Sequence, residues 1–218
     1  MKTRFAMLLF LAWTAIPIAA LAQDKQEKPA EPARPQRPGG FGGPITLNPD
    51  DVQAFPDPPA GIDANGDGIP HGKLEMVEYD SKSVGAKRKM QVYTPPDYSP
   101  EKKYPVLYLL HGIGGDETEW DRFAKPGLLL DNLLADKKSL PFIVVMPFGY
   151  GVPPMATGVQ GQNTVKFSED LRQDVIPFIE GRYRVHSDRD RRALAGLSMA
   201  RGQALRIGLN NLELFSYV

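Results

Sequence analysis

The pattern of apolar and polar side chains becomes regular from residue 74 onward. Residues 74–79 and 90–93 carry apolar and aromatic side chains between polar ones, which predicts two strands joined by a turn around Gly85. Three unbroken apolar runs follow, at residues 104–110, 142–146 and 193–195. Runs of this kind are typical of strands that are buried on both faces of a parallel sheet.

Segments with helical periodicity lie between these runs. The first covers residues 128–136, the second about residues 168–180, and the third residues 199–209. Pro177 is expected to kink the second helix. Because strands alternate with helices, the pattern predicts an α/β fold with a mostly parallel sheet flanked by helices. The apolar residues 214–218 predict the start of one more strand.

The chain begins with the features of a secretory signal peptide. A basic start precedes an apolar run over residues 5–20, and the small residues Ala20 and Ala22 suit cleavage before Gln23. We therefore expect residues 1–22 to be removed on export, which predicts a secreted or periplasmic protein. After this cleavage no membrane span is expected, because no later segment is long and apolar enough to cross a bilayer.

Residues 23–60 hold nine prolines among several glycines. Proline interrupts helices and sheet ladders alike, so this stretch is predicted to be a disordered linker. Recognition of the proline-rich stretch by a partner is the alternative. Residues 61–218 are then expected to form the α/β domain.

Composition and charge exclude several classes of function. The 218 residues carry a formal net charge of zero, so no nucleic-acid partner is predicted, because such binding needs clustered positive charge. There are no cysteines, which excludes disulfides, thiolate catalysis and zinc–thiolate sites. No cofactor is predicted, and the composition sets no oligomeric state. The length allows one medium-sized domain with tails.

A candidate calcium loop lies just before the regular pattern begins. Residues 63–68 read Asp-Ala-Asn-Gly-Asp-Gly, which matches the first half of an EF-hand loop. Position twelve of such a loop needs a bidentate glutamate, and it is Leu74 here, with Glu75 one residue late. A polar turn is therefore the favoured interpretation, and no metal site is predicted.

The strongest chemical motif is Gly196-Leu197-Ser198-Met199, which follows an apolar strand and precedes a helix. This is the context of a nucleophile elbow, in which a tight turn presents the serine hydroxyl over the end of the sheet. Ser198 is the predicted nucleophile. The amide of Met199, at the positive end of the helix dipole, is predicted to stabilise an oxyanion.

A second motif, Leu110-His111-Gly112-Ile113-Gly114-Gly115, also follows an apolar strand. Its glycines let the backbone curl so that an amide, assigned to Ile113, faces the reacting carbonyl. A phosphate-binding loop is the alternative, but the motif is not GxGxxG and no GK[ST] follows it. The predicted oxyanion loop accordingly contains His111, Gly112, Gly114 and Gly115.

With Pro70-His71-Gly72-Lys73, Tyr93-Thr94-Pro95-Pro96 and Trp120, these motifs make the chain resemble the esterase D-like group. That group includes feruloyl esterases of carbohydrate esterase family 1, acetylxylan esterases and enterochelin-esterase-like proteins. The resemblance covers about residues 70–218. It implies an α/β-hydrolase fold, a nucleophile at Ser198, oxyanion donors at Ile113 and Met199, and an ester substrate, often linked to plant polysaccharide.

The chain departs from the family pattern in two ways. The family has Gly-x-Ser-Met-Gly-Gly, whereas this chain has Ala200 and Arg201. The methyl group of Ala200 is expected to cost about 1 kcal/mol where helix and strand approach closely, and Arg201 either reaches solvent or narrows the acyl pocket. The family's acid and histidine follow the nucleophile, but the twenty residues after Ser198 include neither Asp nor His. The expectation is therefore a truncated hydrolase that lacks the last strands.

The three histidines of the chain are not expected to supply the missing base. His186 precedes the strand that ends near Ser198, which places it roughly 20 Å or more away at ~3.3 Å per residue. His71 precedes the first strand and has no evident route to the site. His111 follows a neighbouring strand, but the resemblance gives it a structural role in the oxyanion loop.

Trp120 lies just after the oxyanion loop. It is predicted either to contact an aromatic acyl group or a sugar of the substrate, or to anchor a helix in the core. The carboxylates around it, among them Glu119, are interpreted as the solvated start of a helix.

The leading interpretation is an exported serine carboxylic-ester hydrolase that forms an acyl-enzyme at Ser198. An acyltransferase on the same fold is one alternative, because only the acceptor would differ. A non-catalytic remnant or carbohydrate-binding module is another, and the missing histidine favours it. Feruloyl, acetyl and siderophore esters all remain open as substrates, because a fold does not name its ligand.

Overall fold

The computed structural model describes residues 47–152 and 160–218, and the chain divides into two units, Met1–Ala54 and Phe55–Val218. In the first unit, the described residues 47–54 form turns and irregular backbone. The signal peptide expected at 1–22 and most of the linker expected at 23–60 lie outside the described residues. Within the described ranges, no helix has the length and apolar character needed to cross a membrane.

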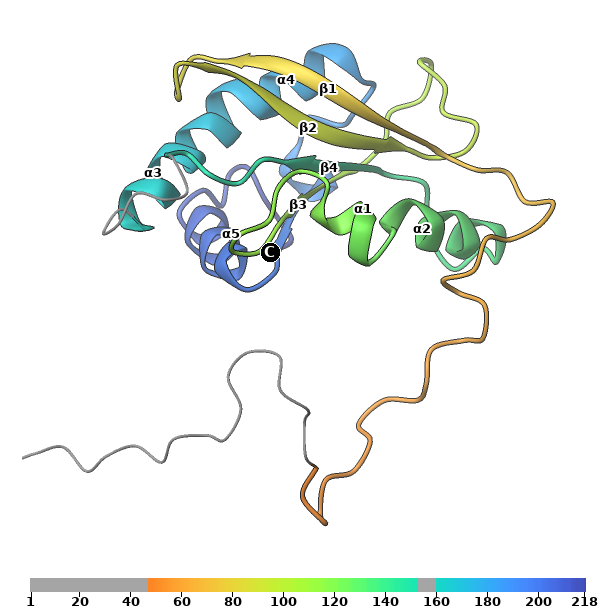
Figure 1. Ribbon diagram of the computed structural model, residues 1–218. Helices are drawn as coiled ribbons and strands as arrows, with labels where there is room; N and C mark the ends of the chain where they lie inside the picture. The colour runs from red at the N-terminus through yellow and green to blue at the C-terminus, as the bar shows by residue number, and fades with distance from the viewer. Residues whose placement is uncertain (1–46, 153–159) are drawn as a thin grey trace, which may run out of the picture. The chain divides into compact units, whose positions relative to one another are not determined.

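The second unit is built on a five-stranded sheet with the strand order β1-β2-β4-β3-β5 (Figure 1). The parallel part consists of β4 (Ile143–Pro147), β3 (Val106–Leu110) and β5 (Arg192–Gly196). A hairpin of β1 (Lys73–Ser81) and β2 (Ala86–Thr94) adds two antiparallel strands next to β4. Five of the six strands expected from the sequence are confirmed. Gly85 makes the hairpin turn at a φ of +77°, which glycine adopts without strain.

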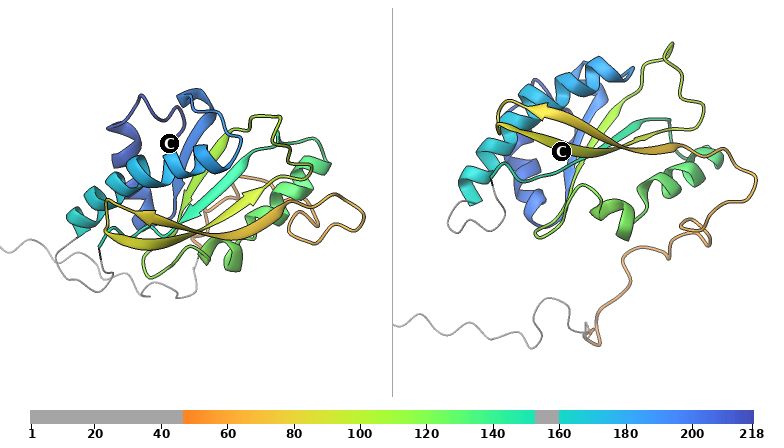
Figure 2. Two further views of the ribbon diagram at one scale, coloured as in Figure 1. Left: turned by 90° about the horizontal axis from the view of Figure 1, so that it is seen from above. Right: turned by 45° about the horizontal axis from the view of Figure 1, so that its top comes forward.

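Helices cover both faces of this sheet (Figures 1 and 2). One face packs against α1 (Glu119–Phe123) and α2 (Pro126–Ala135). The other packs against α3 (Gln160–Asp170), α4 (Ile176–Arg182) and α5 (Met199–Leu209). The α/β architecture predicted from the sequence is therefore present. A short 3-10 helix, η2 (Arg189–Arg191), leads into β5.

The helix predicted over residues 168–180 is part of a longer helical stretch. A π-helical turn, η1 (Leu171–Val175), separates α3 from α4 immediately before Pro177. Proline has no amide hydrogen, and its ring would clash with the carbonyl of Gln173 in a regular α-helix. The distortion expected at Pro177 therefore appears as a π-turn. The helix predicted at residues 199–209 has the bounds that α5 shows.

The core forms on both sides of the sheet because the parallel strands carry apolar side chains on both faces. All five residues of β4 are buried. The larger cluster lies under α3, α4 and α5 and includes Tyr108, Leu110, Phe167, Leu171 and Ile207. The smaller one, on the side of α1 and α2, contains Tyr93, Val144 and Met146 with Trp120 and Leu130 packed against them.

The strand expected at residues 214–218 is reduced to a single bridge. Tyr217 pairs in parallel with Ala193, and its carbonyl accepts the amide of Leu194 at 2.9 Å. Just before it, a turn is closed by the amide of Leu214 donating to the carbonyl of Asn211 at 2.9 Å. This turn occupies the beginning of the apolar run, which is why the run alone overestimated the extent of strand.

A hydrogen bond between β1 and the end of α4 has a definite pH dependence. The hydroxyl of Tyr183 donates to Oε1 of Glu75 at 2.6 Å, and this bond is the main cause of a lowered pKa for Glu75. Burial and the same bond raise the pKa of Tyr183 to about 12. Since the folded-state pKa of Glu75 lies below the unfolded one, the stabilisation is present above the unfolded value of about 4.3 and is lost as pH falls through the folded value.

Replacing Tyr183 by phenylalanine is therefore expected to lower the free energy of unfolding by about 1 kcal/mol at pH 7. The loss should be smaller at pH 3, because the stabilisation decreases as the pH falls towards and through the lowered pKa of Glu75. Urea unfolding of both proteins at the two pH values measures this difference. Tyr217→Phe, at an exposed tyrosine, is the control and should show no such pH dependence. An equal loss at both pH values would contradict the assignment.

Candidate active site

The backbone at Ser198 is strained in the way that a nucleophile elbow requires. Ser198 connects β5 to α5 with φ 55° and ψ −109°, a backbone conformation that residues other than glycine rarely adopt. Hydrogen bonds fix the turn: the amide of Leu197 donates to Leu110 at 3.2 Å, and that of Ala200 to Leu197 at 2.9 Å. Ser198 is exposed at the carboxyl end of the parallel strands, where the motif predicted it.

Helix α5 approaches β5 so closely that residue 196 has no room for a side chain. A Cβ built on Gly196 would lie 2.5 Å from the carbonyl oxygen of Ala200 and 2.7 Å from its Cβ. Ala200 itself is fully buried. The extra methyl group at position 200 is thus accommodated opposite a glycine. Arg201 is exposed, which leaves the solvent-directed alternative for its side chain.

The predicted oxyanion loop lies beside this elbow. A Cβ built on Gly112 would be 3.8 Å from the Cβ of Ser198, and Gly114 has a φ of +77°. Among the described residues, no hydrogen-bond acceptor is bound to the amide of Ile113 or to that of Met199. The loop residue next to Ile113 thus lies beside Ser198, and within the described part of the chain both predicted donor amides are without an acceptor.

His111 shapes the loop and is not free to act as a base. It is 1% exposed, and its Nε2 accepts the amide of Gly149 at 2.8 Å. Its Nδ1 lies 2.8 Å from the carbonyl oxygen of Gly112, so Nδ1 carries the proton and donates it. Because both ring nitrogens are occupied by backbone groups, His111 holds the oxyanion loop, as the resemblance implied.

The other two histidines lie at the opposite end of the sheet. The amide of His186 donates to the carbonyl of Tyr104, just before β3 begins, whereas Ser198 follows the end of β5. The Nδ1 of His71 lies 3.1 Å from Asp131 of α2. His186 is therefore at the beginning of the parallel strands and Ser198 at their end, as expected from the sequence.

Three residues outside the predicted motifs support the oxyanion loop, two by direct contact and one through Gly149, which itself binds His111. Glu119 accepts the amide of Gly112 at 2.9 Å, and the hydroxyl of Tyr150 accepts the amide of Gly114 at 2.7 Å. Gln203 of α5 donates to the carbonyl of Gly149 at 3.0 Å. The sequence did not predict the contacts of these three residues, which are Glu119, Tyr150 and Gln203.

Glu119 begins α1 as expected, but the interpretation of its carboxylate as solvated is wrong. Its side chain is only 17% exposed and lies against the loop. No local pattern could reveal such a contact. Tyr150, by contrast, lies three residues after the end of β4. The carboxyl ends of neighbouring parallel strands meet at one edge of a sheet. That rule could have found it.

Trp120 belongs to the smaller core. Its ring packs with Tyr93 and Met146, and its Nε1 donates to the carbonyl of Leu110 at 3.0 Å. A tryptophan whose N–H and ring are both engaged in this way supports the end of β3. The contacts favour the core anchor among the two interpretations of this residue.

The candidate calcium loop is an exposed turn whose carbonyl groups are occupied by a side chain. The Nδ2 of Asn132, on α2, donates to the carbonyl of Ile62 at 2.8 Å and to that of Ala64 at 2.9 Å. Asp63 and Asp67 are exposed. The contacts therefore attach the turn to α2, in agreement with the polar-turn interpretation.

The fold and the elbow together define an α/β-hydrolase, and comparisons with known proteins give the family. The family model named Esterase matches residues 81–218, and the chain belongs to this family. A curated relative, the endo-1,4-beta-xylanase/feruloyl esterase of Xylanibacter ruminicola, is 39% identical over 155 residues, which are 68% of this chain and 21% of that protein. The chain thus spans about a fifth of its length.

Solved structures agree with this assignment. A CE1 ferulic acid esterase from Anaeromyces mucronatus in complex with ferulic acid has a TM-score of 0.69 and 27% identity, over 77% of this chain and 64% of that one. The S954A mutant of the feruloyl esterase module from Clostridium thermocellum, complexed with sinapinate, has a TM-score of 0.62 and 26% identity, over 76% of this chain and 58% of that one.

Proposed function

We propose that this protein is a serine carboxylic-ester hydrolase in which Ser198 is the nucleophile and the amides of Ile113 and Met199 bind the oxyanion. The observation that carries the proposal is the strained backbone of Ser198 at the end of β5. The two predicted donor amides, which have no acceptor within the described ranges, support it. Membership of the Esterase family supports the ester as the substrate class.

In this proposal, Oγ of Ser198 forms a bond to the ester carbonyl carbon and the alcohol leaves with the proton. Water then attacks the acyl-enzyme, releases the acid and restores the serine hydroxyl. Negative charge develops on the carbonyl oxygen in both steps, which is where preorganised amides lower the barrier. The described histidines offer no free ring nitrogen beside Ser198, so the proposal assigns no residue to the role of base.

We further propose that the substrates are feruloyl or acetyl esters of plant polysaccharide. We also propose that the protein is exported and hydrolyses these esters outside the cytoplasm. The names of the xylanase-linked relative and of the ferulic acid esterase support this substrate class. The signal-peptide pattern at residues 1–22 supports export.

The test uses protein expressed from its full coding sequence. We expect a fluorophosphonate probe to label the protein and methyl ferulate to be hydrolysed, and both activities to disappear in Ser198→Ala. The matched control is Ser187→Ala, at an exposed serine before β5, which should retain both. Absence of labelling and hydrolysis in the wild type would favour the non-catalytic alternative. Transfer of the acyl group to an added alcohol in preference to water would favour the acyltransferase.

A further inference from the structure

The segment after β4, residues 148–150, forms two hydrogen bonds with the oxyanion loop. The amide of Gly149 donates to Nε2 of His111 at 2.8 Å, and the hydroxyl of Tyr150 accepts the amide of Gly114 at 2.7 Å. The rings of Phe148 and Tyr150 also lie 5.7 and 5.4 Å from the imidazole of His111. The position of this segment therefore sets the position of the loop that carries the Ile113 amide.

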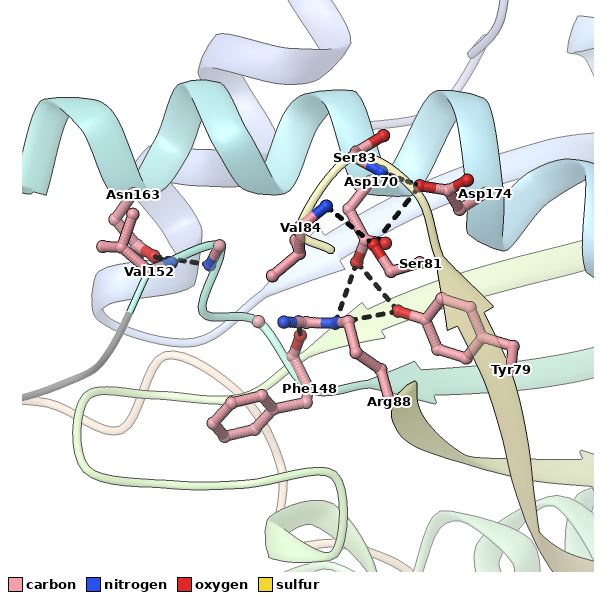
Figure 3. A network of polar contacts seen from close by, with 12 residues as sticks. Tyr79, Ser81, Ser83, Val84, Arg88, Phe148, Val152, Asn163, Asp170 and Asp174 are labelled. Atoms are coloured by element: carbon pink, nitrogen blue, oxygen red, sulfur yellow. Dashed lines mark hydrogen bonds and ion pairs between the residues drawn. The ribbon is translucent and has the colours of Figure 1, made fainter. Parts of the chain in front are cut away.

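Arg88 on β2 anchors the same segment. Its Nη2 donates to the carbonyl oxygen of Phe148, and its guanidinium lies 5.3 Å from the centre of the Phe148 ring (Figure 3). Phe148 is the first residue after β4, so this bond fixes the backbone at the point where the segment leaves the sheet. Arg88 itself is 8% exposed.

The guanidinium is in turn held from the opposite side. Its Nε lies 3.2 Å from Oδ2 of Asp170 and donates to the hydroxyl of Tyr79 at 3.1 Å, and this hydroxyl donates to the same carboxylate at 2.8 Å (Figure 3). Asp170 is fully buried at the end of α3. Arg88 thus connects α3 and the β1–β2 hairpin to residues 148–150, the segment that is hydrogen-bonded to the oxyanion loop.

We propose that Arg88 is a positioning residue for the oxyanion loop, acting through the Phe148 carbonyl and residues 149 and 150. The inference rests on the proposed function for its catalytic meaning. The geometry needs a planar fork, because Nε donates to the hydroxyl of Tyr79 beside the Asp170 carboxylate while Nη2 donates to the carbonyl of Phe148. A lysine ammonium has the same charge but concentrates it at one atom, so it can remain beside Asp170 only by giving up the Phe148 carbonyl.

Arg88→Lys is accordingly the informative variant, because it keeps a positive charge near the buried carboxylate. Amide hydrogen exchange measured by NMR should become about tenfold faster at Gly114 and Gly149, as expected when one hydrogen bond that restrains a segment is lost. The amides of Val144 and Val145, within β4, should be unchanged. Tyr150→Phe should affect Gly114 and leave Gly149 protected, and Lys87→Met, at an exposed neighbour on β2, should affect neither.

In ester hydrolysis, Arg88→Lys should lower kcat about tenfold and leave KM within about twofold, because oxyanion contacts act in the transition state. Faster exchange at the loop with unchanged β4 supports the positioning role, even if no ester is hydrolysed; in that case the proposed function alone fails. Equal acceleration across β1, β2 and β4 would show a general structural role and overturn the inference. Unchanged exchange at Gly114 and Gly149 would overturn it as well.

Discussion

Replacing Gly196 by alanine is expected to destabilise the domain by about 3 kcal/mol, because backbone atoms of Ala200 in α5 occupy the space that the new methyl group would need. The added Cβ would be 2.5 Å from the carbonyl oxygen and 2.6 Å from the carbonyl carbon of Ala200. Relief requires α5 to move away from β5, which also shifts Ser198 and the Met199 amide. Urea unfolding and fluorophosphonate labelling should therefore both report a loss.

Two further variants make this test specific. Gly202→Ala makes the same change six residues later, on an exposed part of α5 where a Cβ would meet nothing within 4 Å. It should raise stability by about 0.5–1 kcal/mol, because glycine is a poor helix former. Combining Gly196→Ala with Ala200→Gly should recover little stability, since the closest contacts are with backbone atoms. Full recovery would show that the clash involves only the side chain of Ala200.

Removal of the Asp170 carboxylate by Asp170→Ala is expected to cost about 3–5 kcal/mol, because it leaves the guanidinium of Arg88 nearly buried without its partner. The Asp170 side chain is 0% exposed and that of Arg88 7%. Burial raises the pKa of Asp170, whereas the hydroxyl of Ser81, the charge of Arg88 and the hydroxyl of Tyr79 oppose this shift. Urea unfolding at pH 7 measures the cost.

The matched control is Asp174→Ala, one helical turn later. Asp174 is only partly buried, and it accepts the amide of Ser83 at 2.9 Å. Its loss should cost about 1 kcal/mol, the usual value of a hydrogen bond. The double variant Arg88→Met with Asp170→Leu should be less destabilised than Asp170→Ala, because no buried charge remains unpaired. A cost below that of the control would contradict a strong buried pair.

Most of the fold could be predicted because it depends on local patterns. The unbroken apolar runs identified β3, β4 and β5, and the helical periodicity gave the bounds of α5. The prediction failed at residues 214–218, where the apolar run yields only the bridge at Tyr217 because a turn occupies its beginning. At Pro177 the expected distortion is present, but its form, a π-turn, could not be predicted from the sequence.

The candidate site was predictable to the extent that each of its parts is local in sequence. A nucleophile elbow needs a strand, a small residue, a serine and a helix in this order along the chain. A glycine-rich loop that follows a strand can likewise be recognised from the sequence. The roles of Glu119, Gln203 and Arg88 were not predictable. Each contacts a backbone group from another element, and charged or amide side chains on a strand or helix usually face solvent.

By itself, the sequence determined the order of elements, the Ser198 elbow and the glycine loop, because backbone preference and apolar periodicity act over a few neighbouring residues. Only the tertiary structure decided that both ring nitrogens of His111 are occupied and that Arg88 anchors the segment after β4. The physical reason is that a hydrogen bond depends on distance and direction in space. Residues 88 and 148, sixty positions apart, meet only because β2 and β4 are neighbours in the sheet.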